Sequence, residues 1–397
     1  MRLFRCFLFV LLVLSPKLII AFTFDSDDIN YAYHPFCDYY SENFLGADAA
    51  GRGYSGVADM GGIESTLLNP ASLHIENKVQ FYYELGLKNN IGFLNEYYNN
   101  LEFSQYRKGT AYGLAYSINE DYQIGLFFGK KHSINAELGP VIIYDYYYAP
   151  VDTLHGYLKK TCSTINIPLS YRVNDNFQLG ASLNIEMYNS EQPLVLFDIY
   201  GNHQFVKSEA DFALIRPVIG LILSFNENIS FGTSFQNSVR KNIIEDATLI
   251  HIKYLENTFP WEIKSGLKYR MQKVPLNLYI DFRHIHTSEY HDMNDRNDFF
   301  IGADYKLKKY LLKLGYFSQN EYRDLSLKIS EEIDYWIDNK PHDRHFLTLG
   351  GSYTWKQLNF SLSYIDSRIL SPNEDSQRYF KFSITFKPLK IFRQRKK

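Results

Sequence analysis

Histidines and acidic residues gather in two places where they could hold a metal ion. The larger group contains His284, His286, Glu289, His291 and Asp292. His284 and His286 are two positions apart and would share one face of a strand, so a site of the zinc type is geometrically feasible there. A smaller group lies in 341–345, Pro-His-Asp-Arg-His. Loop histidines beside acidic residues are more often solvated than metal-bound, and we predict no metal ligand and no cofactor.

A glycine-rich segment could point to a second kind of chemistry. Gly51-Arg52-Gly53-Tyr54-Ser55-Gly56 has the spacing of a dinucleotide fingerprint. That motif requires a preceding apolar strand, a following helix and an acidic residue about 20 positions later. The preceding residues 39–50 do not form such a strand pattern. The chain also has no Gly-x-Ser-x-Gly elbow and no assignable acid pair, so we predict that it is not an enzyme.

Composition narrows the protein class before any motif is used. The chain has 397 residues, with 42 Lys and Arg against 44 Asp and Glu, a net charge of −2. A hydrophobic fraction of 45% excludes a disordered chain, and the balanced charge argues against nucleic-acid binding. Aromatic residues reach 17%, of which 33 are Tyr and 30 are Phe. Such residues favour strands, because they pack well on a pleated surface.

The first 21 residues resemble a secretory signal peptide. Arg2 and Arg5 precede the apolar run 6–14, and 19–21 offers a cleavage site. The run is much shorter than the roughly 20 residues of a transmembrane helix. An uncleaved N-terminal anchor is the alternative. Cys37 and Cys162 are too few for a disulfide framework, and their pairing stays open.

The remainder of the chain alternates between apolar and polar residues with a period of two, as in 358–364 and 379–386. Six tight turns are expected at 118–122, 173–177, 225–229, 272–273, 308–309 and 356–357. They join twelve strands, and 79–87 and 378–387 add two more, giving 14 in all. The intervening segments are long and polar: 89–108, 132–160, 190–210, 240–257, 288–296, 320–342 and 369–376.

This pattern predicts an all-β fold, a closed antiparallel transmembrane β-barrel of about 14 strands. Short turns at one rim and long loops at the other are typical of barrels in the outer membrane of Gram-negative bacteria, with tight turns and both termini periplasmic. One face of the sheet would meet outer-membrane lipids and the other would line a lumen. A strand ending at Phe386 suits the barrel assembly machinery, although the basic tail 388–397 is an addition. A secreted β-sandwich or β-solenoid is the alternative.

The segment Gly46–Leu73 resembles the N-terminal region of the FadL-type family of outer-membrane transporters for long-chain fatty acids and hydrocarbons, which includes PorV-like relatives. The matching residues are Gly51-Arg52-Gly53, Gly56-Val57-Ala58-Asp59 and Asn69-Pro70-Ala71-Ser72-Leu73. The family commonly has Gly where Ser72 stands, and acidic or small residues in place of Met60-Gly61-Gly62. The resemblance implies that 22–77 folds as a plug inside a barrel formed by 78–387.

Five residues are candidates for shaping or gating the plug: Gly51, Gly53, Gly56, Asn69 and Pro70. Glycine tolerates positive φ and close contact with the barrel wall. Asn69 and Pro70 would end or redirect a short helix near 63–68. The alternative is that the Asn-Pro pair is only a stop before the first strand.

Charged residues on the polar face would line the lumen: Glu186, Glu262, Lys264, Lys268, Arg270, Asp281, Arg283, Asp304, Lys313 and Lys381. We expect Lys264, Lys268, Arg270 and Arg283 to orient a carboxylate head group beside apolar pockets for its tail. Mutual pairing of these charges inside the barrel is the alternative.

The function that follows is passive uptake of hydrophobic or amphipathic small molecules, of the long-chain fatty-acid kind, through a plugged lumen. A second reading is a PorV-like protein that binds or hands over secreted proteins, for which the Tyr-rich segment Val141–Tyr148 offers contact area. A third is an outer-membrane enzyme, which only the loop histidines support.

Overall fold

A computed structural model describes residues 45–88, 106–144, 150–197, 203–242, 256–288, 294–320, 343–370 and 378–388. The expected signal peptide 1–21, the first part of the plug segment (22–44), Cys37 and the tail 389–397 lie outside the described residues. So do half of the histidines and acids of the two groups, namely Glu289, His291, Asp292 and His342. Within the described ranges, no helix is both long and apolar enough to span a membrane.

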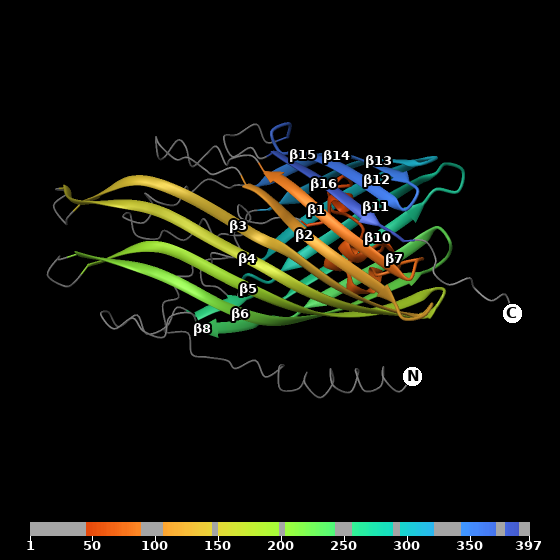
Figure 1. Cartoon of the computed structure of the whole chain (residues 1–397), viewed down its shortest axis with the longest axis horizontal. Helices are drawn as coiled ribbons and strands as arrows, with labels where there is room; N and C mark the ends of the chain where they lie inside the picture. Colours follow the sequence, from red (N-terminus) through yellow and green to blue (C-terminus); the bar gives the residue numbers. More distant parts are fainter. Residues whose placement is uncertain are drawn as a thin grey trace, which may run out of the picture. The chain divides into compact units, whose positions relative to one another are not determined.

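Almost all described residues are in strands (Figure 1). Their bounds are β1 (Val79–Lys88), β2 (Tyr106–Ser117), β3 (Tyr122–Tyr144), β4 (Pro150–Asn174), β5 (Phe177–Phe197), β6 (His203–Ser224), β7 (Ile229–Gln236), β8 (Val239–Asn242), β9 (Glu256–Phe259), β10 (Glu262–Arg270), β11 (Leu276–Ile285), β12 (Arg296–Leu307), β13 (Tyr310–Gln319), β14 (Arg344–Trp355), β15 (Leu358–Asp366) and β16 (Arg378–Phe386). The helical pieces are short: α2 (Ala47–Ala50) and the 3₁₀ turns η1 (Ile63–Leu67) and η2 (Pro70–Ser72).

Fourteen of these strands form one closed antiparallel barrel, and β8 pairs with β9 in a separate two-stranded sheet. The barrel closes where β1 pairs with β16, from Phe81 opposite Phe386 to Lys88 opposite Tyr379. All six tight turns lie where the sequence predicts them. Asparagine side chains stabilise three of them locally: in the first, the Asn119 side-chain oxygen accepts from the backbone N–H of Asp121 at 2.9 Å and of Tyr122 at 2.8 Å. We call this end of the barrel the tight-turn rim.

The two faces of the sheet differ in polarity as the sequence predicts. In β12, Phe299 and Ile301 are each 50% exposed on the outside, whereas Asp298 is fully buried inside. Aromatic residues on the outer face gather near the tight-turn rim: Tyr116, Tyr269, Tyr305, Tyr310 and Trp355. An apolar exterior with an aromatic girdle and a polar interior is the surface of a barrel in a bilayer. The fold is thus a transmembrane β-barrel, and a sandwich or solenoid is excluded.

Two of the predicted long loops are instead extensions of strands. The segments 132–160 and 190–210 continue the hairpins β3–β4 and β5–β6, leaving only 145–149 and 198–202 as their connections. Figure 1 shows these four strands running past the ends of their neighbours. The polar composition of these segments made them resemble loops, but ladder pairing continues from Tyr122 opposite Tyr171 to Tyr144 opposite Pro150. Backbone hydrogen bonds between neighbouring strands therefore extend both hairpins.

The described part of the plug, residues 45–75, packs against the inner face of the barrel. Ile63 and Leu73 are buried against Tyr82, Ala111 and Phe127 of the wall. Tyr54 packs edge-on against Phe317 of β13, with ring centroids 5.4 Å apart. Apolar plug side chains thus fill space that a channel would leave open.

Glycines on the inner face of the wall let the plug backbone approach. A Cβ on Gly180 would lie 2.1 Å from the Ala71 nitrogen, and one on Gly315 would lie 2.2 Å from the Arg52 carbonyl carbon. Several further wall glycines face the plug in the same way: Gly220, Gly232, Gly302 and Gly350. Close contact with the plug backbone and side chains therefore explains why glycine occupies these wall positions.

Candidate functional site

A cavity of about 160 Å³ lies between the plug and the barrel wall. The wall contributes residues from β3 to β12, and the plug contributes Leu45, Tyr54, Val57, Thr66, Leu67 and Leu68. Several lining residues lie at strand ends far from the tight turns, among them Pro260, Thr287 and Arg296. The cavity is thus on the side of the plug that faces the other rim, the rim with the longer connections.

Five cationic side chains line this cavity: Lys131, Arg216, Lys264, Arg283 and Arg296. They come from five different strands, β3, β6, β10, β11 and β12. The acidic residues in the lining are Glu262 and Asp281. The lining therefore contains more basic than acidic side chains.

Two buried carboxylates hold four of these cations. Glu186 accepts from Lys131 at 2.7 Å and lies 3.4 Å from Arg216. A second group has the same arrangement, in which two cations share one carboxylate among the described residues.

In that group, Asp298 lies 2.5 Å from Arg283 and 2.9 Å from Arg296. The Arg283 guanidinium also lies over the Phe300 ring, 5.7 Å from its centroid. Lys264 is paired with Glu262 at 2.9 Å and donates to the Leu67 carbonyl at 3.2 Å. The mutual pairing of charges that the sequence left as an alternative is thus present among the described residues.

Apolar groups cover other parts of the cavity. Leu67 and Leu68 of the plug face it together with the wall residues Val218, Phe259 and Phe300. Phe259 belongs to a buried aromatic cluster with Tyr188, whose ring centroid is 4.7 Å away. The cavity therefore has an apolar part and a part lined by cationic side chains, a combination that suits an amphipathic anion.

Ion pairs anchor the first half of the plug to the wall. Arg52 lies 2.9 Å from Asp59 and 3.6 Å from Asp304 of β12, and its guanidinium is 4.7 Å from the Tyr279 ring centroid. Lys268 of β10 reaches Asp59 at 2.6 Å, and Lys313 of β13 pairs with Asp48. Burial alone would raise the pKa of Asp48, but the charges of Lys313 and Arg52 hold it well below its usual range.

Two wall carboxylates bind the plug through its backbone. Glu84 accepts from the N–H groups of Gly46 at 2.9 Å and Ala47 at 2.8 Å, and Lys381 lies 3.0 Å from the same carboxylate. Asp281 accepts from Gly56 at 2.5 Å and Val57 at 2.8 Å. Removing either acid would leave buried donors without a partner, which is costly.

The five plug residues expected from the sequence occupy distinct positions. Gly53 and Gly56 have φ of 69° and 126°, a region that favours glycine, and Gly53 also lies against the backbone of Tyr316. Gly51 packs against Gly350 with φ of −63°. Close contact, and not positive φ, therefore explains the glycine at position 51.

Asn69 and Pro70 join the two 3₁₀ turns. η1 ends at Leu67, and Asn69 caps η2 by accepting from the Ala71 N–H at 3.0 Å. The Asn69 amide also donates to Val57 at 2.9 Å and to Leu221 of the wall at 3.0 Å. The side chain thus both redirects the chain and attaches it to β6.

The four candidate ligand-binding cations separate into three environments. Lys264 and Arg283 line the cavity, and Lys268 instead pairs with Asp59 of the plug. Arg270 is exposed at the end of β10, by the tight turn, and does not line the cavity. The structure therefore brings two of the four together beside the cavity.

Sequence reasoning did not select Lys131, Arg216 and Arg296 as cavity residues. Arg216 continues the inner face of β6 and could have been found by its alternation. Lys131 could not, because the register of β3 against β4 shifts between Lys130 and His132. A shift of one residue exchanges the two faces of a strand.

Comparison with known proteins assigns this architecture to a recognised class of barrel. No family profile matches the chain, and no curated protein does. Among solved structures, a FadL homologue from Pseudomonas aeruginosa matches with a TM-score of 0.62 at 13% identity, over 87% of this chain and 99% of that one. The toluene transporter TbuX from Ralstonia pickettii matches with a TM-score of 0.64 at 14% identity, over 86% and 98%.

A third similar structure is the toluene transporter TodX from Pseudomonas putida, with a TM-score of 0.60 at 12% identity over 88% of this chain and 99% of that one. The chain therefore has the fold of the FadL-type barrels. The resemblance expected from Gly46–Leu73 is confirmed at the level of the fold.

Proposed function

We propose that the protein is an outer-membrane channel for the passive uptake of amphipathic anions with an apolar tail, such as long-chain fatty acids. The observation that carries the proposal is the cavity beside the plug, whose described lining combines Leu67 and Leu68 with five cationic and two acidic side chains. Similar structures named as toluene transporters support the hydrophobic part of the substrate. The cations support the carboxylate.

The path that we propose begins at the rim with the longer connections and ends at the tight-turn rim. The tail would lie against Leu67, Leu68 and Phe259, and the carboxylate against Lys264 and Arg283. Exit requires the plug to move. Because the first half of the plug is held by buried ion pairs, we propose that the part around η1, which rests on single hydrogen bonds such as Ser234 to Leu68 at 2.8 Å, moves instead.

Uptake by whole cells tests this function, because a lipopolysaccharide leaflet admits hydrophobic compounds slowly whereas phospholipid vesicles admit them unaided. Radiolabelled oleate uptake should rise when the protein is expressed. Lys264→Gln should lower it about tenfold, equivalent to roughly 1.4 kcal/mol of lost charge-assisted binding. Toluene uptake should not change, since toluene has no carboxylate.

Arg270→Gln is the matched control, because it removes a cation from the same strand outside the cavity. Equal oleate uptake with and without the protein would contradict the function. Equal uptake by Lys264→Gln and the unaltered protein would contradict the role of the cation. The PorV-like alternative relies on 141–148, whose side chains lie outside the described residues, and no described contact favours it.

A further inference from the structure

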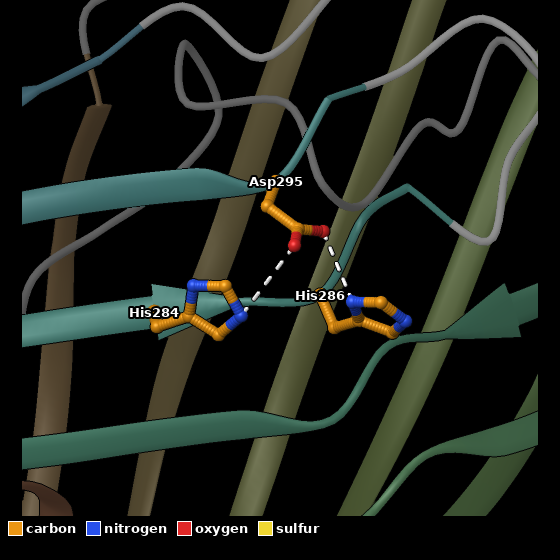
Figure 2. Close-up of side chains that lie close together, drawn as sticks. All are labelled: His284, His286 and Asp295. Carbon is orange, nitrogen blue, oxygen red and sulfur yellow. Dashed lines mark ion pairs between the residues drawn. The ribbon is translucent and has the colours of Figure 1, made fainter.

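A second cluster of polar side chains lies outside the cavity, at the rim with the longer connections (Figure 2). It consists of His284 near the end of β11, His286 just beyond that strand, and Asp295 just before β12. All three side chains are partly buried, and one ligand atom from each lies within 4.8 Å of the others. Figure 2 shows both imidazoles turned toward the carboxylate.

We propose that His284, His286 and Asp295 form a binding site for a divalent transition metal of the zinc type. Two imidazoles and one carboxylate are a donor set that zinc accepts, with bonds of about 2.0–2.2 Å. Tetrahedral ligands at such distances are roughly 3.3 Å apart. His284 Nε2 lies 3.6 Å from Asp295 Oδ2 and His286 Nδ1 lies 3.0 Å from Asp295 Oδ1, so each imidazole faces one oxygen of the carboxylate at close to that separation.

The tautomer of His284 leaves its Nε2 atom available to bind a metal. Its Nδ1 lies 2.8 Å from the side-chain oxygen of Asn297, and an amide oxygen can only accept a hydrogen bond. Nδ1 therefore carries the hydrogen, and Nε2 presents a lone pair toward Asp295. The Asn297 amide nitrogen is held by the Asp295 carbonyl at 3.4 Å. Such an outer partner, fixing the tautomer and ring orientation of a histidine, is typical of metal sites.

Neighbouring groups restrict the conformations of the His286 and Asp295 side chains. The Trp261 ring stacks on His286 with centroids 4.9 Å apart and lies 5.0 Å from His284. Asp295 accepts from the Ser288 backbone N–H at 3.0 Å. The three donors thus stand on restrained side chains, which lowers the ordering entropy that metal binding must overcome.

The site lies on the opposite face of the chain from the cavity. His284 and His286 alternate with Arg283, Ile285 and Thr287, which line the cavity. A bound metal would tie the end of β11 to the start of β12 without occupying the lumen. It would leave one tetrahedral position for water or another ligand, because three protein donors are supplied.

Isothermal titration of the detergent-solubilised protein with zinc chloride tests the site, using protein purified without a polyhistidine tag. The unaltered protein should bind zinc with a dissociation constant in the micromolar range or below, and magnesium should not compete, since imidazole ligands suit zinc and not magnesium. His284→Ala and Asp295→Asn should each weaken binding at least tenfold. X-ray absorption of the zinc-loaded protein should show imidazole ligands near 2.0 Å.

His345→Gln is the matched control, because His345 lies on β14 with Tyr316 as its partner, at 2.8 Å, and should leave zinc affinity unchanged. Heat-dependent gel migration checks that each variant is folded. If His284→Ala misfolds, Asp295→Asn still tests the site, because asparagine has nearly the same shape as aspartate. Absence of zinc binding to the unaltered protein would overturn the proposal. So would equal affinity in a folded Asp295→Asn or His284→Ala variant.

Discussion

Among single residues, Glu64 of the plug carries a buried carboxylate oxygen that has no hydrogen-bond partner among the described residues. Burial, followed by the negative charge of Asp48, raises the pKa of the Glu64 carboxyl from 4.5 to about 7. The folded protein therefore holds this proton more tightly than the unfolded chain. Its contribution to stability is most favourable below pH 4.5 and is lost as the pH rises through about 7.

We predict that Glu64→Gln removes the loss of stability that Glu64 causes as the pH rises. The variant should become more stable than the unaltered protein as the pH rises from 4.5 to 8, by no more than about 3 kcal/mol. Urea unfolding in lipid vesicles at several pH values measures the difference. Asp48 and Asp59 act with the opposite sign, because their depressed pKa values stabilise the fold at neutral pH and that contribution is lost in acid. An unchanged pH profile in Glu64→Gln would show that Glu64 is not the titrating group.

At the scale of elements, the plug has two parts with different attachment. Around α2, buried ion pairs and the Glu84 carboxylate hold the chain. Around η1, hydrogen bonds join mostly neutral groups, such as Thr66 and Asn166 at 3.3 Å, and Lys264 adds one charged donor to the Leu67 carbonyl. Neutral hydrogen bonds contribute about 1 kcal/mol each, and bonds to charged groups contribute more. The η1 region is therefore the part that a ligand could displace.

A cysteine pair at Thr66→Cys and Asn166→Cys, in a background without Cys37 and Cys162, should test this element. Oxidation should lower oleate uptake at least tenfold, and reductant should restore it, because the cross-link pins η1 to β4. The control pair Ala47→Cys and Ser363→Cys joins residues whose native groups already bond at 2.6 Å in the anchored region. It should not affect uptake. Full uptake with η1 cross-linked would mean that ligand passes without its movement.

For the whole molecule, closure of the barrel determines how readily the protein unfolds in detergent. Pairing of β1 with β16 leaves no free edge in the 14-stranded barrel, so unfolding must break many ladders together. We predict that unheated protein in dodecyl sulfate migrates faster on a gel than boiled protein. Urea-denatured protein that is not boiled should migrate like the boiled sample. Identical migration of all three would be inconsistent with a closed barrel.

Local information in the sequence was sufficient to predict the barrel. The side-chain period of two assigned Asp304 and Lys381 to the inside, where both are buried. Asn119, Asn174 and Asn226 marked turns through bonds to the backbone only two or three residues later. These effects need no distant partner. The extent of β3 to β6 was not predictable in this way, because it depends on ladder pairing with the neighbouring strand.

The sequence by itself determined a closed barrel with an inner and an outer face, six tight turns and a plug of glycines and small residues. Only the tertiary structure decided which charges meet. Lys313 pairs with Asp48 across 265 positions, Arg270 lies outside the cavity, and His284 shares Asp295 with His286. The physical reason is that alternation depends on neighbours along one strand, whereas an ion pair depends on the register of several strands and on the path of the plug between them.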